Sequence, residues 1–297
     1  MGLTDYINTT WIWWTATLLY AVIILSTVVV VVSENRNPVK SLAWVTVLLV
    51  VPGLGLVLYI VFGRNIQSKR IISRRNRRRL KRIAADAPGD SFTQLRQSPK
   101  ASQLARLATA LCSTDYYEGN AATIFDNGTD KFRALLADIA AATKFINIEY
   151  YIIADDRIGT ALARALEERA RAGVKVRIIY DHVGSFKTKK RYFKSLRDAG
   201  VEAYPFFEVV FPPFGTRINW RNHRKICVID GTVGYIGGMN VADRYVDGGK
   251  LFDLWRDLHL RVEGPAVASL QQAFAVDWNF MGKELLDTPV EARPVAG

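Results

Sequence analysis

Residues 144–180 decide the fold of this chain, and they read KFINIEYYIIADDRIGTALARALEERARAGVKVRIIY. The apolar run at 144–153 predicts a strand, and residues 159–172 predict an amphipathic helix that ends at Gly173. Residues 174–180 alternate between polar and apolar side chains, which is typical of a half-buried strand. Strands that alternate with helices indicate an α/β layered domain.

The same alternation continues toward the C-terminus. We expect helices at 189–199 and 265–280, and strands at 201–207, 225–229, 233–236 and 258–262. Asp230-Gly231 separates two of these strands and is a signal for a tight turn. The α/β domain is therefore expected to span residues 120–282, followed by a tail at 283–297 that has no core pattern.

Two stretches near the N-terminus predict attachment to a membrane. Residues 11–32 and 41–62 contain no Asp, Glu, Lys or Arg. A bilayer core of ~30 Å is crossed by ~20 apolar helical residues, so each stretch is long enough to span it. The second stretch contains Pro52-Gly53, which a membrane helix tolerates. We expect a transmembrane hairpin of two helices within residues 1–63.

The formal net charge of the 297-residue chain is +12, and it is concentrated in one segment. Ten Lys and Arg residues and no acidic residue lie between 64 and 82, so the rest of the chain is close to neutral. We therefore expect a basic juxtamembrane collar and linker at 64–119 rather than a nucleic-acid-binding domain. Basic flanks stay in the cytoplasm, which places both termini and the α/β domain there. The collar either lies against anionic headgroups or only fixes this orientation.

The side chains that carry chemistry follow one another closely. His223 and Lys225 are two residues apart in a strand and therefore share a face. An imidazole beside an ammonium suits attack on an anion, because the lysine binds the anion while the imidazole acts as nucleophile or proton carrier. Asp230 has the other parity and lies at the turn, where it is expected to hold backbone. Gly237-Gly238 permits close approach of backbone, and Asn240 offers an amide donor.

The sequence also suggests structural or functional roles for four further residues. Glu149 lies inside an apolar strand and is either a buried, paired carboxylate or a site residue. His182 follows a strand and either lines a pocket or belongs to a polar loop, whereas His259 is interpreted as structural. Cys227 is expected in the core. With Cys112 as the one other cysteine, the chain has neither a disulfide framework nor a structural zinc site.

The pattern His223-x-Lys225-x4-Asp230-x6-Gly237-Gly238-x-Asn240 resembles the signature of the phospholipase D superfamily. Other segments resemble bacterial cardiolipin synthases, and they are residues 36–44, 52–55, 59–65, 148–152, 180–185 and 255–259. The resemblance extends from about residue 11 to residue 287. It implies a phospholipase D-like layered domain preceded by the transmembrane hairpin.

The resemblance implies a membrane-bound phosphatidyl transferase of the bacterial cytoplasmic (inner) membrane, which makes cardiolipin from two molecules of phosphatidylglycerol. The reaction passes through a phosphatidyl-histidine intermediate and releases glycerol. His223 is then the nucleophile, and Lys225 and Asn240 hold phosphate oxygens. Asp230 completes the catalytic motif in a structural role, and Asp257 orients the imidazole of His223. No metal and no other cofactor is implied, and no nucleic acid is expected as a partner.

The family uses two such motifs that face each other, and this chain contains one. A second histidine would protonate the leaving glycerol oxygen, which is otherwise hard to expel. We therefore expect the second motif to come from another copy or from a C-terminal half, and the sequence favours a truncated chain or a pseudo-half over a homodimer. Two alternatives remain, a homodimeric hydrolase or nuclease with a single motif and a non-catalytic partner of a full-length synthase. The near-neutral α/β domain argues against the nuclease.

Overall fold

The computed structural model describes residues 3–34, 38–51, 53–59, 99–112, 117–206, 208, 221–248, 255–283, 286 and 295. The chain divides into two compact units. Unit 1 comprises Met1–Arg70 with Val209–Trp220, and unit 2 comprises Ile71–Glu208 with Arg221–Gly297. The predicted basic segment at 64–82 and most of the predicted tail lie outside the described residues.

Unit 1 begins with a long apolar helix, α1 (Leu3–Glu34), which contains the whole first predicted span. Its stretch Thr10–Ser33 is long and apolar enough to cross a membrane. The second predicted span is divided into α2 (Pro38–Val50) and α3 (Leu54–Leu58). Gly53 lies between these helices at a φ of 77°, in the left-handed region that favours glycine. Within the described residues, α1 is thus the one helix that satisfies the length and composition of a span.

Helices α2 and α3 approach each other closely. A Cβ added to Gly55 would lie 2.6 Å from the carbonyl oxygen of Val47, so a larger residue would push the two helices apart. The rings of Trp44 and Tyr59 meet edge to face with centroids 5.5 Å apart. Small residues permit this close packing between helices where water does not drive association.

Unit 2 is built on one seven-stranded sheet in the order β1-β7-β6-β5-β2-β3-β4. The strands are β1 (Ala121–Phe125), β2 (Phe145–Tyr150), β3 (Lys175–Asp181), β4 (Glu202–Phe206), β5 (Lys225–Ile229), β6 (Val233–Gly237) and β7 (His259–Glu263). Strands β2, β3 and β4 are parallel, whereas β5 joins β2 in antiparallel register and begins the antiparallel half. The predicted α/β layered domain is confirmed.

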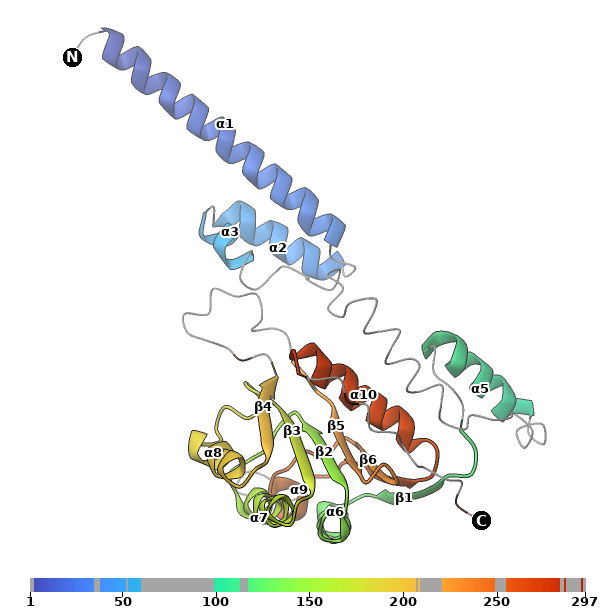
Figure 1. Ribbon diagram of the computed structural model, residues 1–297. Coiled ribbons are helices and arrows are strands. Elements are labelled where there is room, and N and C mark those ends of the chain that lie inside the picture. Colours follow the sequence, from blue (N-terminus) through green and yellow to red (C-terminus); the bar gives the residue numbers. More distant parts are fainter. Residues whose placement is uncertain are drawn as a thin grey trace. The chain divides into compact units, whose positions relative to one another are not determined.

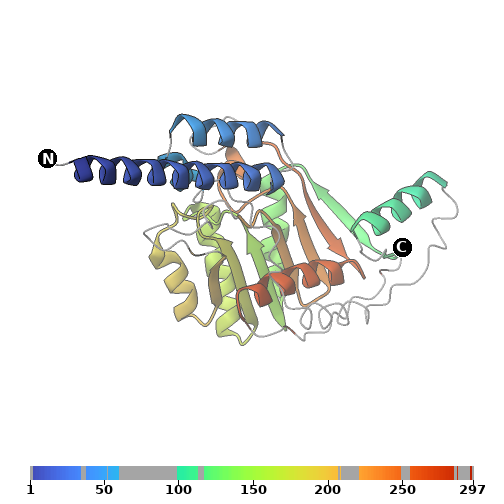
Figure 2. The ribbon, with the colours of Figure 1, turned by 90° about the horizontal axis from the view of Figure 1, so that it is seen from above.

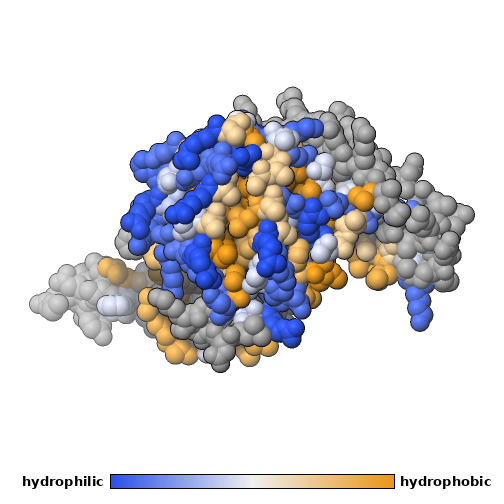
Figure 3. All heavy atoms as spheres, turned by 90° about the horizontal axis from the view of Figure 1, so that it is seen from below, coloured by the Kyte–Doolittle hydropathy of each residue, from blue (hydrophilic) through white to orange (hydrophobic). Residues whose placement is uncertain are grey.

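Helices cover both faces of this sheet (Figures 1 and 2). One face carries α6 (Gly128–Ala141), α7 (Arg157–Arg171), α8 (Lys190–Asp198) and the short α9 (Arg244–Asp247), and the other carries α10 (Val267–Phe280). Unit 2 also includes α5 (Pro99–Cys112). Seen from below, the outer side of the helical layer is mostly hydrophilic (Figure 3).

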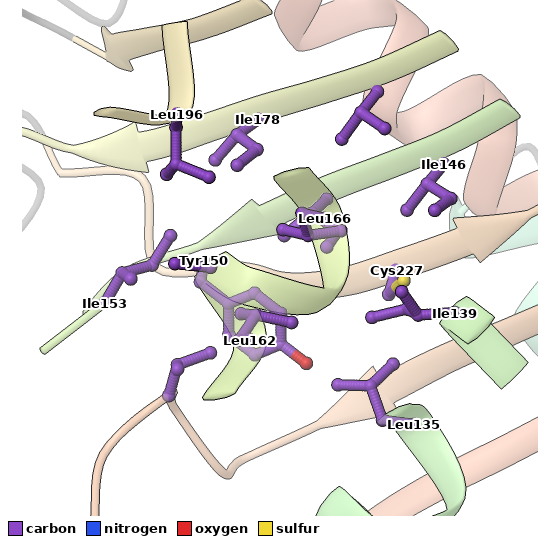
Figure 4. Packing of buried hydrophobic residues seen from close by; sticks show 14 of the residues in the cluster. Leu135, Ile139, Ile146, Tyr150, Ile153, Leu162, Leu166, Ile178, Leu196 and Cys227 are labelled. Atoms are coloured by element: carbon purple, nitrogen blue, oxygen red, sulfur yellow. The ribbon is translucent and has the colours of Figure 1, made fainter. Parts of the chain in front are cut away.

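The two faces of β2 bury different kinds of side chain. Ile146 and Tyr150 point toward α6 and α7, where they pack with the leucines of those helices (Figure 4), and Ile148 belongs to the same cluster. Residues of the opposite parity point toward α10, and among them Glu149 is only 1% exposed. Because successive strand residues alternate between faces, a carboxylate in this apolar run lies under α10 and not in the larger apolar cluster.

Candidate active site

The fold brings the candidate residues to one edge of the sheet. Strands β2, β3 and β4 end at this edge, and β5 begins there because Lys225 pairs with Tyr150 in antiparallel register. His223 precedes β5 and is exposed, whereas Lys225 is 4% exposed. The sequence predicted that these two side chains share a face, and the structure places them in contact.

The ammonium of Lys225 is held against His223. Its Nζ lies 3.1 Å from Nδ1 and 3.3 Å from Nε2 of the imidazole, and it donates to the His223 carbonyl oxygen at 2.7 Å. The ring of Tyr151 packs on His223 with centroids 4.6 Å apart, and Nζ of Lys225 lies 5.3 Å from the Tyr151 centroid. The imidazole and the ammonium are therefore positioned together, with the Tyr151 ring beside both.

The electrostatic state of this pair suits attack on an anion. Burial, followed by the charge of Lys225, lowers the pKa of His223 below its ordinary value, while Asp181 acts in the opposite direction. Burial lowers the pKa of Lys225 to about 8, and the carboxylate of Asp257 opposes this shift. Near neutral pH the imidazole keeps a free lone pair while most of the lysine remains charged. A nucleophile and an anion-binding cation thus coexist in one pH range.

The segment that carries His223 is fixed by hydrogen bonds on both sides. The Asn222 backbone N–H donates to Oδ2 of Asp181 at 3.0 Å, which ties it to the end of β3. The Arg224 backbone N–H donates to Oδ1 of Asn222 at 3.1 Å. The backbone around His223 is therefore held by its two neighbours, and the imidazole itself contacts Lys225 and Tyr151.

Glu149 belongs to a buried carboxylate pair beneath the site. The Asn222 amide donates to Oε1 of Glu149 and, at 3.1 Å, to Oδ2 of Asp277, which also receives the guanidinium of Arg224. Burial, followed by the neighbouring Asp277, raises the pKa of Glu149 well above its ordinary value. This geometry supports the first of the two readings, a buried and paired carboxylate that holds Asn222.

Asn240 is buried, and both ends of its amide have partners. Its Oδ1 accepts from the Ile152 N–H at 3.0 Å, and its Nδ2 donates to the Tyr245 hydroxyl at 2.7 Å. Backbone bonds between Val241 and the segment after β2 lie beside it. The amide therefore joins the ends of β2 and β6, and one of its two N–H groups remains for a ligand.

Asp257 lies close to Lys225, since its charge acts on the pKa of that lysine. Its Oδ1 accepts from the Leu258 N–H at 2.8 Å. Glycine is required opposite it, because a Cβ on Gly238 would lie 1.9 Å from the same oxygen. Within the described residues no hydrogen bond joins Asp257 to His223. The carboxylate therefore acts on the pair through its charge, which raises the pKa of Lys225.

Asp230 lies at the far end of β5, five residues beyond Lys225, or ~16 Å along a strand. It has a φ of 52° and Gly231 a φ of 72°, as in the tight turn that the sequence predicted. Its carboxylate accepts from the backbone N–H groups of Thr143, Lys144 and Phe145 at 2.8 to 2.9 Å. Burial raises its pKa, yet these bonds outweigh that effect and leave the pKa below its ordinary value. Asp230 holds backbone and does not touch the imidazole.

Two family models match this chain. Residues 135–278 match the family described as cardiolipin synthase, PLD-like domain, and residues 18–64 match the family described as phospholipase D-nuclease N-terminal. Residues 135–278 belong to the cardiolipin synthase family, within its PLD-like domain. The apolar helix α1 and the matching N-terminal family together identify a membrane protein.

Curated relatives agree with this membership in the phospholipase D superfamily. Cardiolipin synthase 2 of Bacillus cereus is 39% identical over 272 residues, which are 90% of this chain and 53% of the relative. The major cardiolipin synthase ClsA of Bacillus subtilis is 36% identical over 269 residues, 88% of this chain and 56% of the relative. The chain spans about half the length of the curated relatives it matches. Among solved structures, NucT from Helicobacter pylori covers 55% of this chain and 97% of its own, with a TM-score of 0.41 and 18% identity.

The structure also locates the other residues for which the sequence made a prediction. Cys227 is fully buried in the core, as predicted. His259 is also fully buried, neither ring nitrogen has a hydrogen-bond partner, and burial lowers its pKa to about 2, which agrees with a structural reading. His182 lines a cavity of about 410 Å³ at the ends of β3 and β4, which agrees with the interpretation that it lines a pocket. No group of three or more His, Cys, Asp or Glu side chains in the described ranges could hold a metal ion.

Sequence reasoning assigned no role to several residues of the cardiolipin synthase-like site, which are Tyr151, Asp181, Asn222, Arg224 and Asp277. For two of them the sequence position could have indicated a role in the site. Asp181 ends a strand parallel to β2, and Asn222 directly precedes the nucleophile candidate. Asp277 lies on a distant helix, and its contact with Asn222 depends on how α10 packs on the sheet.

Proposed function

We propose that this chain supplies one half of the active site of a membrane-bound phosphatidyl transferase, which makes cardiolipin from two phosphatidylglycerol molecules. The observation that carries the proposal is the contact between His223 and Lys225, in which an imidazole of lowered pKa lies 3.1 Å from a buried ammonium. The cardiolipin synthases among its relatives support the choice of substrate.

In the first step a ring nitrogen of His223 attacks phosphorus of one phosphatidylglycerol. A P–N bond forms, the P–O bond to the headgroup glycerol breaks, and the glycerol oxygen leaves with a proton from an acid. The ammonium of Lys225 stabilises the negative charge that grows on the phosphate oxygens as phosphorus becomes five-coordinate. The enzyme then carries a phosphatidyl-histidine.

In the second step a glycerol hydroxyl of another phosphatidylglycerol attacks the same phosphorus. Its proton passes to a base, a new P–O bond forms and the P–N bond breaks, which restores the imidazole. The products of the two steps are one cardiolipin and one glycerol. No oxidant, reductant or metal is needed for this balance.

The acid and base of these steps require a second group besides His223. We infer that a second HxKxxxxD motif supplies it, either from another copy of the chain or from a C-terminal half. Two of the remaining groups serve substrate binding and orientation in this proposal. The second N–H of Asn240 contacts a phosphate oxygen, and Asp257 orients the catalytic pair. Glu149 fixes Asn222 beneath His223.

The membrane location of the reaction follows from the substrate. We propose that the protein is a multi-pass protein of the bacterial cytoplasmic membrane, with unit 2 on the cytoplasmic side. The segments 11–32 and 41–62 would form the hairpin, and the break at Gly53 is compatible with a second span that is not a straight helix.

The proposal is tested with the full chain in phosphatidylglycerol vesicles, alone and together with the C-terminal half of the Bacillus cereus relative. Mass spectrometry of the lipids and an enzymatic assay of glycerol should show cardiolipin and glycerol in equal amounts in at least one arm. The matched variant His223→Gln should give neither product. Absence of cardiolipin from both arms, or nicking of plasmid DNA in place of lipid transfer, would overturn the proposal.

A further inference from the structure

The loop between β3 and α8, residues 182–189, carries a large apolar side chain at the surface. Phe186 is 77% exposed and Val183 is 37% exposed. Both lie at the edge of the sheet where β3 ends, which is also the edge that carries His223 and Lys225. An exposed phenylalanine beside a candidate active site indicates a surface that meets something apolar.

Hydrogen bonds hold this loop in place, so the position of the exposed Phe186 is defined. Oδ1 of Asp181 accepts from the backbone N–H groups of Val183 and Gly184 at 3.0 and 2.7 Å. The Ser185 hydroxyl accepts from the Ile153 N–H at 3.1 Å and donates to the Tyr151 carbonyl oxygen at 3.3 Å.

The Thr188 hydroxyl closes the same loop from the other side of Phe186, since it donates to the Ile153 carbonyl oxygen. The loop is therefore bonded to the segment Tyr151–Ile153, and the ring of Tyr151 packs on His223 with centroids 4.6 Å apart. The loop that carries Phe186 is thus bonded to the residue whose ring packs on His223.

Positive charge follows the phenylalanine directly. Lys187, Lys189, Lys190 and Arg191 are all exposed, and no ion pair of the described residues includes any of them. The ion pair nearest in sequence uses Lys194 with Asp198, one turn further along α8. Four cations without counter-ions next to one exposed aromatic ring match an anionic surface that has an apolar interior.

A cavity of about 410 Å³ opens behind this loop. Half of its twelve lining residues are aromatic or apolar, among them Tyr180, Phe193 and Tyr204, while Lys190 and Arg197 supply cations and Glu208 supplies one carboxylate. The combination of apolar walls with a net positive lining fits a phospholipid, whose phosphate lies next to its acyl chains. The phosphate backbone of a nucleic-acid duplex would match the cations but would leave Phe186 without an apolar partner.

We propose that the loop 182–189 and the first turn of α8 dock on the surface of an anionic bilayer, with Phe186 inserted between headgroups and the four cations on lipid phosphates. The cavity then opens toward the lipid from which the substrate comes. The choice of phosphatidylglycerol as the lipid rests on the proposed function. The docking itself does not require that the chain be catalytically active.

The test places an environment-sensitive fluorophore on the loop of the full chain. Phe186→Cys is labelled in a Cys112→Ser background, in which Cys227 is buried. The chain is reconstituted in phosphatidylglycerol vesicles and, separately, in phosphatidylcholine vesicles. The matched control is Ile124→Cys, because Ile124 is 68% exposed and lies on β1 at the opposite end of the sheet.

In phosphatidylglycerol the label at position 186 should shift its emission to the blue and be quenched at least twofold by brominated lipid. The label at position 124 should stay accessible to aqueous iodide in both lipids. Replacing the four cations by Gln should restore the accessibility of the label at 186. Equal accessibility of the two positions in phosphatidylglycerol would overturn the proposal, as would protection of the label by added DNA or by a protein instead of lipid.

A second measurement leaves the loop unmodified. A photoactivatable phosphatidylglycerol in the same vesicles should attach to the peptide that contains residues 182–191, and a peptide free of adduct would contradict docking. Cardiolipin is assayed in parallel. This assay is run with and without the C-terminal half of the Bacillus cereus relative. Docking with no cardiolipin in either arm refutes the proposed function and leaves the docking intact, whereas cardiolipin formation with a water-exposed loop refutes only the docking.

Discussion

Lys225 donates to the carbonyl oxygen of His223 at 2.7 Å, while the same ammonium lies 3.1 Å from Nδ1 of the His223 ring. The lysine is thus anchored on the backbone of the residue whose side chain it assists. One of its three N–H groups holds this position, and the others remain for the ring and for an anion. The arrangement places a positive charge beside the nucleophile before any substrate arrives, so little reorganisation is needed during attack.

Replacement of the nucleophile should abolish phosphatidyl transfer and leave the fold intact. His223 is exposed and its neighbours make the bonds that fix the segment, so the packing that His223→Ala removes is the contact of the imidazole with the Tyr151 ring. Activity should fall by more than about 10²-fold, because no other group can form the covalent intermediate. Acid-labile phosphate on His223 in the parent protein, detected by mass spectrometry, is the matching positive result, and an intermediate on another residue would refute the assignment.

The charge of Lys225 should set the alkaline limit of activity. Burial lowers its pKa to about 8, so the ammonium is progressively lost above that pH and the rate should fall there. Lys225→Met should lower turnover by about 10²-fold below pH 8, since a developing charge loses its partner, and the difference from the parent should shrink above that pH. Lys225→Arg keeps the charge at all these pH values, so whatever activity it retains should lack the fall near pH 8. A change of less than twofold in Lys225→Met would show that the lysine is only a strand cation.

The order of elements in unit 2 could be predicted because its local signals are strong. The helix predicted at 159–172 corresponds to α7, and Gly173, which was predicted to end it, has a φ of 90°. The strand predicted at 225–229 has the same bounds as β5. The strand β1 and helix α6 were not assigned. All but the last residue of β1 are exposed, so the burial pattern that marks a strand is missing from that segment.

The candidate site was predictable only in part, for a physical reason. Side chains that share a strand face, such as His223 and Lys225, follow from the period of two residues. The contact of Asn222 with Asp277 joins residues 55 positions apart and depends on the packing of α10, which no local pattern encodes. The second predicted span illustrates the same limit, because its hydropathy is continuous whereas Gly53 separates α2 from α3.

Asp230 should prove structural when it is removed. Asp230→Ala leaves three backbone N–H groups at the start of β2 without their acceptor, which should destabilise unit 2 by about 2 kcal/mol or more. Because the folded pKa is depressed, the difference between parent and variant should be full above the ordinary aspartate pKa and decline as pH falls below it. Denaturation in detergent at several pH values measures this difference.

The same variant separates structure from catalysis. Turnover per folded molecule of Asp230→Ala should stay within about threefold of the parent, since the carboxylate lies ~16 Å from Lys225 along the strand. Loss of turnover at unchanged stability would place Asp230 in the chemistry and contradict the geometry.

Glu149 should behave as a buried neutral acid. Its pKa is raised by burial and by Asp277, so the folded state binds a proton that the unfolded state releases above about pH 4.3. The stability of the parent should therefore fall as pH rises from that value toward the raised pKa. Glu149→Gln keeps the size and neutrality of the side chain and should lose this pH dependence. A parent and variant with parallel stability profiles would mean that Glu149 is ionised in the folded protein.

The source of the second motif can be decided by mixing chains. If two copies pair and each provides one histidine, an equal mixture of parent and His223→Ala chains assembles at random, and only about a quarter of the pairs keep both histidines. Specific activity should then fall to about half of the value expected from simple dilution. If a C-terminal half supplies the motif, the chain should be inactive alone, and activity with that half should be proportional to the parent fraction. Activity linear in chain concentration down to the nanomolar range, without oligomers in detergent, would contradict both versions. One motif would then suffice, and the leaving glycerol oxygen would take its proton from a group other than a second histidine.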